Sequence, residues 1–275
     1  MPCERKDRVD YIRVEHEYSL VRACKLINLS RSLYYYVSVK NDKDVIDKIL
    51  QLSDKRPMEG QDKIWARIRS EGIIWNHKRI SRVYRMLGMN KKKRTRKRLP
   101  ARVKQPLLVP PGPNKTWSMD FMHDALMNGR KFRTLNIIDD YNREALRVEP
   151  FFSIGSALVI KVLGRLILER GRPDCIRMDN GPEFIASALK DWCSDKGIVL
   201  QYIQPGRPMQ NGYVERFNKS YRNYVLDAYL FEDITQVRIL TDEFMDDYNN
   251  ERPHQSLGDL SPVKYRLRRE NQEVF

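Results

Sequence analysis

One aspartate occupies a position that disfavours a charge. Asp120 lies in the segment Trp117–Phe121, where alternating side chains predict a strand with Trp117 and Met119 on one face and Asp120 on the other. Aspartate is uncommon in strands and costly to bury, so this carboxylate needs a partner, for which a metal ion is a candidate. An aspartate that faces water at a sheet edge is the alternative interpretation.

A second carboxylate follows a short apolar segment. Asp179 comes directly after Cys175–Met178, and Asn180-Gly181-Pro182 then turns the chain towards a predicted helix. The carboxyl end of a strand is where open sheets place their sites. The same residues are also typical of an ordinary turn, in which Asp179 has no chemical role.

Glu215 is the third candidate, and it lies in a segment with helical periodicity. The apolar stripe of this predicted helix consists of Val214, Phe217, Tyr221 and Val225. A polar stripe beside it consists of Asn211, Glu215, Asn218 and Arg222. Glu215 therefore borders the side of the helix that faces the sheet, although an exposed glutamate paired with Lys219 explains it equally well in isolation.

Together the three carboxylates are more specific than any one of them, because their order and surroundings match a known pattern. Between Asp179 and Glu215 lie 35 residues, and the two are embedded in Asp-Asn-Gly-Pro-Glu-Phe and Gln-Asn-Gly-Tyr-Val-Glu-Arg. The sequence resembles the DDE transposases related to retroviral integrases, in particular the second-reading-frame proteins of bacterial insertion sequences. The resemblance covers nearly the whole chain, from Ser-Arg-Ser-Leu-Tyr-Tyr-Tyr at residues 30–36 to residues 248–262.

The resemblance implies both a fold and a reaction. It implies an α/β, ribonuclease-H-like integrase core, with a mixed five-stranded sheet and flanking helices, in which Asp120, Asp179 and Glu215 bind two Mg²⁺ ions that Mn²⁺ can replace. It also implies a DNA transposase that cleaves phosphodiesters at insertion-sequence ends and transfers the freed strands. The donor set suits Mg²⁺, which prefers carboxylate oxygens and retains bound water.

Polar residues near the carboxylates are candidates for positioning and for DNA contact. We expect Asn180 to orient Asp179, and Asn211 and Asn218 to face the metal side of their helix. Candidate phosphate contacts on the same helix are Arg216, Lys219 and Arg222, for which ordinary surface solvation is the alternative. We interpret the pair at 139–140 as strand-end residues and His254 as a structural histidine.

The carboxylates must be positioned by a domain that begins near residue 114. Apolar or alternating segments predict strands at 117–122, 132–139, 145–152, 175–178 and 198–203. Helical patterns cover 154–169, 183–196, 208–228 and 233–249. Three consecutive antiparallel strands followed by alternating helices and strands predict a mixed sheet with helices on its faces.

The first 90 residues have helical patterns only. Residues 16–36 predict two short helices in a helix-turn-helix arrangement, with Ser30 as the cap of the second helix. Apolar positions near 45–50, 64–68 and 80–87 predict three more helices. The last carries His77, Lys78, Arg79, Arg82 and Arg85, mostly off its apolar stripe. We expect a DNA-binding region over residues 1–90, with a three-helix bundle that is merely charged outside as the alternative.

A basic and proline-rich linker is predicted between the two parts. Residues 91–113 have no apolar period and contain five prolines after a run of cations. The run consists of Lys91, Lys92, Lys93, Arg94, Arg96, Lys97 and Arg98. The whole chain has 51 Lys and Arg against 36 Asp and Glu, a net charge of +15 that favours a polyanionic partner. We therefore expect the linker to contact double-stranded DNA.

Composition argues against several other classes of protein. Four cysteines and four histidines are scattered without zinc-ligand spacing, which argues against a zinc finger. The N-terminus lacks an apolar signal core, and the most apolar stretch, 151–168, is interrupted by charges. We expect a cytoplasmic bacterial protein without a membrane partner, associated with the nucleoid when it binds DNA.

Function and partners leave alternatives open. A DNA-binding regulator without chemistry and a simple metal-dependent nuclease both fit parts of the pattern, although the complete carboxylate set argues against the regulator. Two element ends must be brought together, so we expect a homo-oligomer on DNA. No sustained heptad repeat is present, so the protein encoded by the upstream reading frame is a further candidate partner.

Replacing the cations of Lys91–Arg98 with Gln is predicted to weaken DNA binding and to flatten its salt dependence. Each phosphate that a cation neutralises releases counterions, so losing these contacts lowers the slope of log affinity against log salt concentration. Titrating a labelled duplex at several salt concentrations measures this slope. A slope equal to the parent's would remove this segment from the DNA interface.

Overall fold

The chain forms two compact units, residues 1–48 and 49–275. The computed structural model describes residues 2–37, 41–90, 107, 109–204 and 208–273. The division at residue 48 falls within the region predicted to be helical over residues 1–90, inside helix α4 (Lys43–Lys55). Of the predicted linker, the basic segment Lys91–Arg98 lies outside the described residues.

The first unit contains three helices around a small apolar core. They are α1 (Pro2–Glu15), α2 (Leu20–Leu26) and α3 (Arg31–Tyr35). Ser19 and Ser30 cap α2 and α3, each accepting a hydrogen bond from a backbone N–H of the first turn, as expected for serine at this position. The two short helices predicted in residues 16–36 are confirmed. Helix α1 was not predicted, because few of its residues are apolar and, among those whose burial is described, only Val9 is fully buried.

The helical part of the second unit matches the sequence pattern. The C-terminal half of α4 is followed by α5 (Gln61–Ser70) and α6 (His77–Met86), with Ile64, Ile68, Ile80 and Val83 buried. The cations Lys78, Arg82 and Arg85 are exposed on α6, as its periodicity predicts. Arg67 of α5 is buried and pairs with both Glu59 and Asp247 at N–O distances of 2.7 and 2.8 Å.

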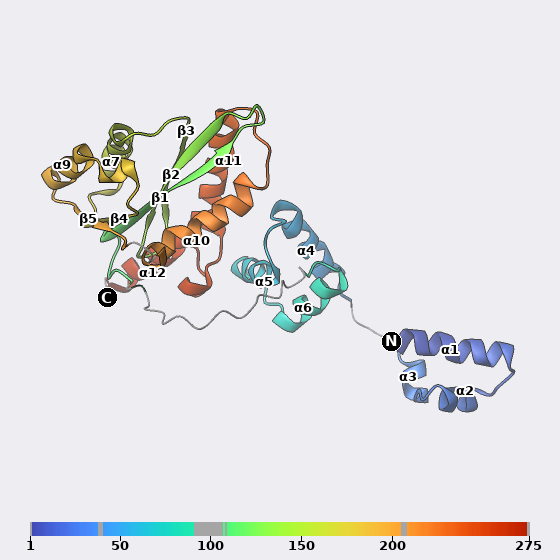
Figure 1. The fold of residues 1–275 in the computed structure, drawn as a ribbon. Helices are drawn as coiled ribbons and strands as arrows, with labels where there is room; N and C mark the ends of the chain where they lie inside the picture. The colour runs from blue at the N-terminus through green and yellow to red at the C-terminus, as the bar shows by residue number, and fades with distance from the viewer. Residues whose placement is uncertain (1, 38–40, 91–106, 108, 205–207, 274–275) are drawn as a thin grey trace. The chain divides into compact units, whose positions relative to one another are not determined.

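The remainder of the second unit is built on one mixed sheet (Figure 1). Its strands are β1 (Thr116–Ala125), β2 (Lys131–Asp139), β3 (Ala145–Phe151), β4 (Cys175–Met178) and β5 (Val199–Tyr202). The spatial order is β3-β2-β1-β4-β5, with β1 antiparallel to β2 and parallel to β4. All five predicted strands and the mixed sheet are confirmed, and β1 is a central strand instead of an edge.

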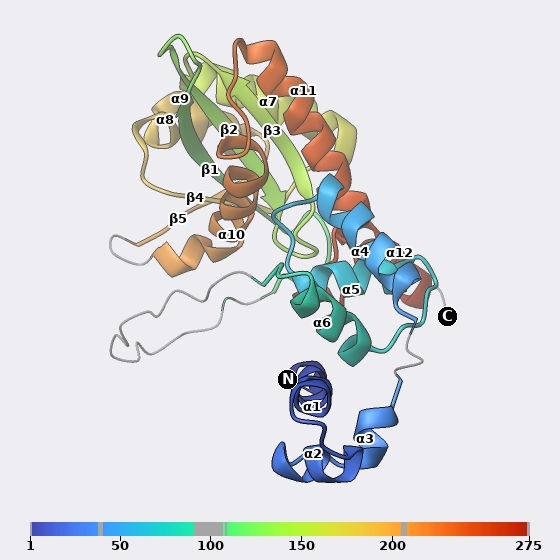
Figure 2. The same cartoon turned by 90° about the vertical axis from the view of Figure 1, so that its right-hand side faces the viewer.

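Helices cover the sheet on both faces (Figures 1 and 2). One apolar cluster lies on each face, between the sheet and the helices that cover it. Trp117 and Met119 of β1 pack with α7 (Ser156–Arg170) and α9 (Ser187–Asp195). On the other face, Met122 packs with α10 (Gly212–Tyr221) and α11 (Ile234–Asp246). Because successive side chains alternate along a strand, Asp120 lies on the face covered by α10.

Several helices are interrupted where the sequence analysis expected them to be continuous. The predicted helix 208–228 is a 3₁₀ turn (Pro208–Asn211), α10 and a π-helical turn (Arg222–Leu226). Val225 and Leu226, at the end of this π-helical turn, are both buried. The predicted helix 233–249 ends at Asp246 and continues as a π-helical turn, Asp247–Glu251.

The predicted helix 183–196 is likewise divided. It forms α8 (Pro182–Ile185) and α9, separated by Ala186 in an extended conformation. In the described part of the chain, no helix is both long and apolar enough to cross a membrane.

Candidate active site

Asp120 lies within β1 and is partly buried beneath α10. Its Oδ2 accepts a hydrogen bond of 2.7 Å from Nδ2 of Asn218, and its Oδ1 accepts one of 2.9 Å from the backbone N–H of Phe121. Burial, together with the charges of Asp179 and Glu215, raises the pKa of Asp120 to about 6, although the hydrogen bonds from Phe121 and Asn218 act to lower it. Keeping Asp120 ionised therefore costs free energy, and a cation bound nearby would lower that cost.

Asp179 approaches Asp120 because β4 lies beside β1 in parallel. Ser118 pairs with Arg177, so the end of β4 is close to the middle of β1. Oδ1 of Asp179 accepts a hydrogen bond of 3.0 Å from the backbone N–H of Gly181, which fixes the turn into α8. This is the turn chemistry expected of Asp-Asn-Gly, but it also holds the carboxylate beside the first strand.

Glu215 is exposed on the first turn of α10. Partial loss of hydration raises its pKa above the ordinary value. Its helix packs on the sheet through Val214, Phe217 and Tyr221, all of which are buried. The packing places Glu215 beside the apolar seam, as predicted from the two stripes of this helix.

The three carboxylates converge but do not form a closed ligand set. Both Asp179 and Glu215 are close enough to Asp120 for their charges to raise its pKa. Within the described ranges, however, no three Asp, Glu, His or Cys side chains are arranged to hold a metal ion by themselves. An ion bound among these carboxylates would need further oxygens, from water or from a ligand.

Amide side chains line the junction between α10 and the sheet. Asn211 is buried and donates through Nδ2 to the backbone oxygen of Met119 at 3.3 Å. Asn218, one turn after Glu215, contacts Asp120 and also accepts a hydrogen bond of 2.7 Å from Nδ2 of Asn136 on β2. Asn211 and Asn218 were predicted to lie here, whereas Asn136 was not, because its only signal in the sequence is an amide in the apolar run 135–138.

The acidic cluster is bordered by an aromatic and ionic contact that was not predicted. Phe121 and Phe184 stack with their ring centroids 4.4 Å apart. Arg133 lies 4.4 Å over the Phe121 ring and pairs with Glu183. This contact connects β1 and β2 with α8, and so supports the turn that carries Asp179.

Comparison with known proteins links these elements to one family. Residues 110–208 and 196–262 match integrase core domain families, and residues 40–98 match an HTH-like domain family. The chain is 35% identical over 256 residues to an uncharacterized 31.7 kDa protein of insertion element IS407 from Burkholderia multivorans, covering 92% of each chain. It is 34% identical to a 39.2 kDa protein of IS476 from Xanthomonas euvesicatoria, covering 89% of this chain and 71% of that protein.

The chain belongs to the integrase-core transposases of insertion elements. The chain is also 23% identical to the putative transposase InsK of insertion sequence element IS150 from Escherichia coli. That match covers 90% of this chain and 94% of InsK. The fold is shared with a chain in the simian T-cell lymphotropic virus intasome in complex with PP2A regulatory subunit B56 gamma. That likeness has a TM-score of 0.52 at 16% identity and covers 78% of this transposase and 73% of that chain.

The candidate DNA-contacting residues of the transposase differ in their exposure and in their ion-pair partners. The basic segment Lys91–Arg98 lies outside the described residues. Arg216 and Lys219 are exposed on α10. Arg222 instead pairs with Asp124 at 2.9 Å and donates to the backbone oxygen of His123 at 2.7 Å. A phosphate that binds Arg222 must therefore compete with a carboxylate already in place.

Two groups left out of the predicted site contact other parts of the fold. Asp139 accepts hydrogen bonds from the backbone N–H groups of Asn114 and Tyr141 at 2.7 and 2.8 Å, and its neighbour Asp140 pairs with Arg177. The ring of His254 packs edge-on against Tyr248, and burial lowers its pKa to about 3. None of these contacts involves the acidic cluster.

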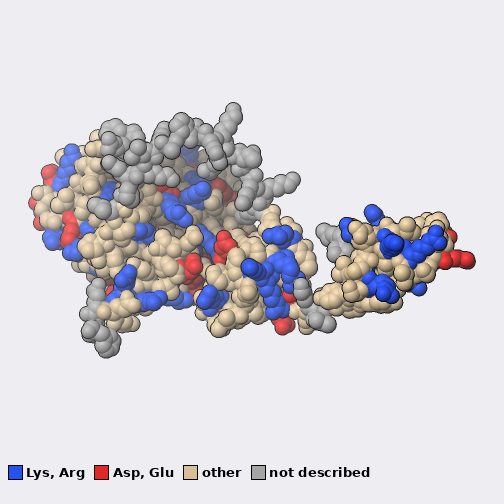
Figure 3. Space-filling view, turned by 90° about the horizontal axis from the view of Figure 1, so that it is seen from below, with Lys and Arg blue, Asp and Glu red and all other residues tan. Residues whose placement is uncertain are grey.

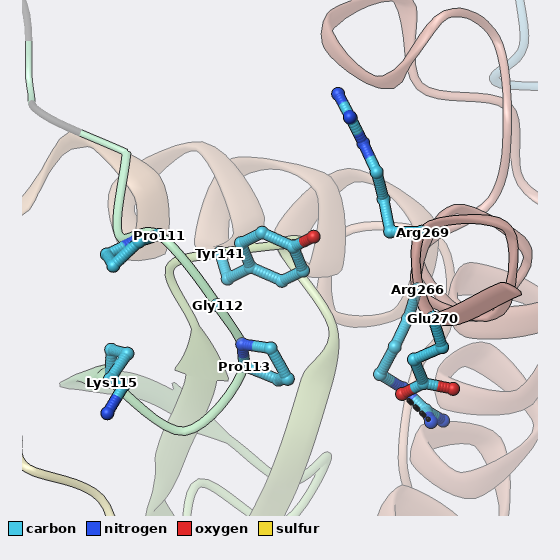
Figure 4. A pocket seen from close by; sticks show the side chains of 8 residues that line it. All are labelled: Pro111, Gly112, Pro113, Lys115, Tyr141, Arg266, Arg269 and Glu270. Atoms are coloured by element: carbon cyan, nitrogen blue, oxygen red, sulfur yellow. Dashed lines mark hydrogen bonds and ion pairs between the residues drawn. The ribbon is translucent and has the colours of Figure 1, made fainter. Parts of the chain in front are cut away.

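A pocket of about 190 Å³ lies away from the three carboxylates (Figure 4). It is lined by the segment Pro111–Pro113, by Lys115 and Tyr141, and by Arg266, Arg269 and Glu270 of α12 (Pro262–Glu273). Two of its cations already have carboxylate partners, Lys115 with Asp174 at 2.9 Å and Arg266 with Glu270 at 3.2 Å. The site is therefore defined by its carboxylates and not by a closed cavity.

Gly181→Ala is predicted to reduce DNA strand joining by about tenfold or more while the protein stays folded. A Cβ at this position would lie 3.1 Å from Oδ1 of Asp179 and would displace that carboxylate, and small misplacements at a reacting centre are costly. Gly60→Ala is the matched control, because a Cβ there meets nothing within 4 Å. Joining by Gly181→Ala at the rate of the control would show that the position of Asp179 is not critical.

Proposed function

We propose that this transposase cleaves and joins DNA at the ends of its insertion element, with Asp120, Asp179 and Glu215 as the catalytic carboxylates. The observation that supports this most directly is their convergence: Asp179, just after β4, and Glu215 on α10 both raise the pKa of Asp120 on β1. A cluster of like charges without a compensating cation is otherwise unfavourable.

The donor set fits divalent metal ions. The three residues offer hard carboxylate oxygens, which Mg²⁺ prefers, and such an ion usually takes its further ligands from water and substrate phosphate. We propose that they hold two Mg²⁺ ions, which would activate the attacking oxygen and neutralise charge on the leaving one. The amide of Asn218 keeps one carboxylate oxygen of Asp120 directed, so that the cluster needs little rearrangement.

One site of this kind serves two successive reactions. In the first, a water oxygen attacks a phosphodiester at the element end, the bond to the 3′ oxygen breaks, and that oxygen leaves as a hydroxyl. In the second, the freed 3′ hydroxyl attacks the phosphorus of a phosphodiester in another segment of DNA. A new ester bond forms, and the 3′ oxygen of the attacked strand leaves. The attacking and leaving atoms are oxygens both times, so the protein has mainly to position them and balance charge.

DNA binding is proposed to involve three basic regions. Exposed Lys78, Arg82 and Arg85 of α6 lie within the part that matches an HTH-like domain. The second region is Lys91–Arg98 and the third is formed by Arg216, Lys219 and Arg222 of the α10 segment. On the face that Figure 3 shows, both units carry many Lys and Arg side chains, with fewer Asp and Glu side chains among them.

A proposed division of labour follows from these regions. Residues 1–90 would bind DNA, residues 91–113 would link the parts and residues 114–275 would carry the chemistry. Leu107 belongs to the linker, and its backbone oxygen accepts a hydrogen bond of 3.1 Å from the hydroxyl of Tyr213 on α10. This contact ties the end of the linker to the helix that carries Glu215.

The proposed reaction requires partners beyond one chain. Two element ends are joined in one event, so we propose a homo-oligomer assembled on DNA in the bacterial cytoplasm, at the nucleoid. The upstream-frame protein of the element is a further proposed partner, which would supply the heptad-containing segment that is not evident in this sequence.

Mn²⁺ is predicted to support strand joining in place of Mg²⁺, whereas Ca²⁺ supports DNA binding but little joining. Ca²⁺ is larger and binds more ligands in looser geometry, which disturbs the in-line arrangement of attacking and leaving oxygens. The measurement is product formation from a labelled element-end duplex under each metal. Undiminished joining in EDTA would reject metal catalysis.

Asp120→Asn, Asp179→Asn and Glu215→Gln are each predicted to abolish cleavage and joining while the protein stays folded and bound to DNA. Each change removes one charge from a repelling cluster, so the melting temperature in EDTA should equal or exceed that of the parent. Asp174→Asn is the control: it removes an exposed carboxylate just before the same strand β4, where a surface ion pair contributes little.

The same assay separates the alternatives. A parent protein that binds the duplex without reaction is a regulator, and one that only cleaves is a nuclease. A variant that joins DNA at near the parent rate removes that residue from the catalytic set. A variant that loses activity only in proportion to a lower melting temperature identifies a scaffold residue instead.

A further inference from the structure

Asn136 is a buried amide placed directly opposite Asp120. The two residues are paired in the antiparallel register of β1 and β2, so their side chains emerge on the same face of the sheet. Asn136 is fully buried among apolar neighbours on β2, and its Nδ2 donates to Oδ1 of Asn218 at 2.7 Å. Asn218 in turn donates to Asp120 at 2.7 Å.

The chemistry of these groups allows only one direction for this chain of hydrogen bonds. An ionised carboxylate can only accept, so Asn218 must present its Nδ2 to Asp120. Oδ1 of Asn218 then faces β2, where it needs a donor, and Asn136 supplies one. If the Asn136 amide were reversed, two carbonyl oxygens would face each other, and Asn218 would be driven to turn its oxygen towards Asp120.

The arrangement is not the one that packing alone would select. Oδ1 of Asn136 is buried and has no hydrogen-bond partner among the described residues. A buried acceptor without a partner is costly, and a β-branched apolar residue would suit this central strand better. The reason for an amide at this position is therefore its N–H donor, which forms the hydrogen bond to Asn218.

We propose that Asn136 is a positioning residue for the metal-binding carboxylate: through Asn218 it fixes the orientation of Asp120. This inference rests on the proposed function, because it assigns Asp120 to the metal. Asn218 stands one turn after Glu215 on α10, so the same hydrogen bonds also set the catalytic helix against β1 and β2. Asn136 itself touches neither metal nor DNA.

The test is Asn136→Val, which removes the donor and keeps an apolar side chain suited to a strand. We expect the Mg²⁺ concentration that gives half-maximal joining to rise severalfold, which is less than the roughly tenfold or greater loss of metal affinity that follows removal of a direct partner of a metal ligand, because Asn136 acts one contact further out. The increase in melting temperature that Mg²⁺ causes in the DNA-free protein should shrink, while the melting temperature in EDTA stays at or above the parent value. The second readout does not depend on catalysis.

Thr134→Val is the matched control. Thr134 is buried on the same face of β2, and its hydroxyl has no hydrogen-bond partner in the described part of the chain. Its replacement should leave both Mg²⁺ readouts unchanged. A double mutant completes the design: if Asn136 acts only through Asn218, then Asn136→Val adds no further effect to Asn218→Ala.

Specific outcomes would overturn the proposal. Parent-like Mg²⁺ readouts for Asn136→Val reject it, as does an effect that simply adds to that of Asn218→Ala or that follows a lower melting temperature in EDTA. Should Asn136→Val not fold, Asn136→Ala is measured against the same criteria. If the parent binds Mg²⁺ without joining DNA, the proposed function fails, yet the Mg²⁺-dependent melting shift still decides the role of Asn136. A parent that shows no such shift rejects this role.

Discussion

Repulsion between carboxylates held close together is the constraint around which the catalytic part of the chain is organised. Asp120 is partly buried, and its pKa of about 6 reflects lost hydration together with the charges of Asp179 and Glu215. Such a cluster does not assemble by itself, so rigid elements must hold it. The sheet supplies two carboxylates from the neighbouring strands β1 and β4, and α10 brings the third through its buried apolar stripe. Stability thus comes from the apolar clusters, while the charges stay available for cations.

The two faces of the sheet divide these tasks. On one face, Trp117 and Met119 of β1 pack beneath α7 and α9 in a core without any part of the acidic cluster. On the other face, the apolar core formed with α10 and α11 ends beside Asp120. The amide side chains of Asn136 and Asn218 lie between this core and the carboxylate. Amides suit this position, because each can offer a donor to a carboxylate without adding a charge. A lysine there would neutralise the cluster and compete with a metal ion for the same oxygens.

The sequence was informative wherever a local pattern decided the structure. Alternation located the strands, helical stripes oriented α10, and the motifs around Asp179 and Glu215 identified the family before any geometry was known. Features that depend on distant pairing could not be predicted. Asn136 acquires its meaning from the register of β1 and β2, and Arg222 from its contact with Asp124 across the fold. The 3₁₀ and π-helical turns within the helix predicted over 208–228 also had no signal in the helical periodicity.

The open character of the cluster connects catalysis to DNA binding. Because no three described side chains form a complete ligand set, a divalent ion at this site must take further oxygens from water or from a phosphate. A phosphate is present only when DNA is bound, and the cations proposed to bind it flank the same helix that carries Glu215. Metal affinity and DNA affinity are therefore expected to rise together, since each ligand supplies charges that the other needs. On this proposal, the acidic cluster would reach full metal ligation only once DNA is bound, which would confine cutting to DNA that is already in position.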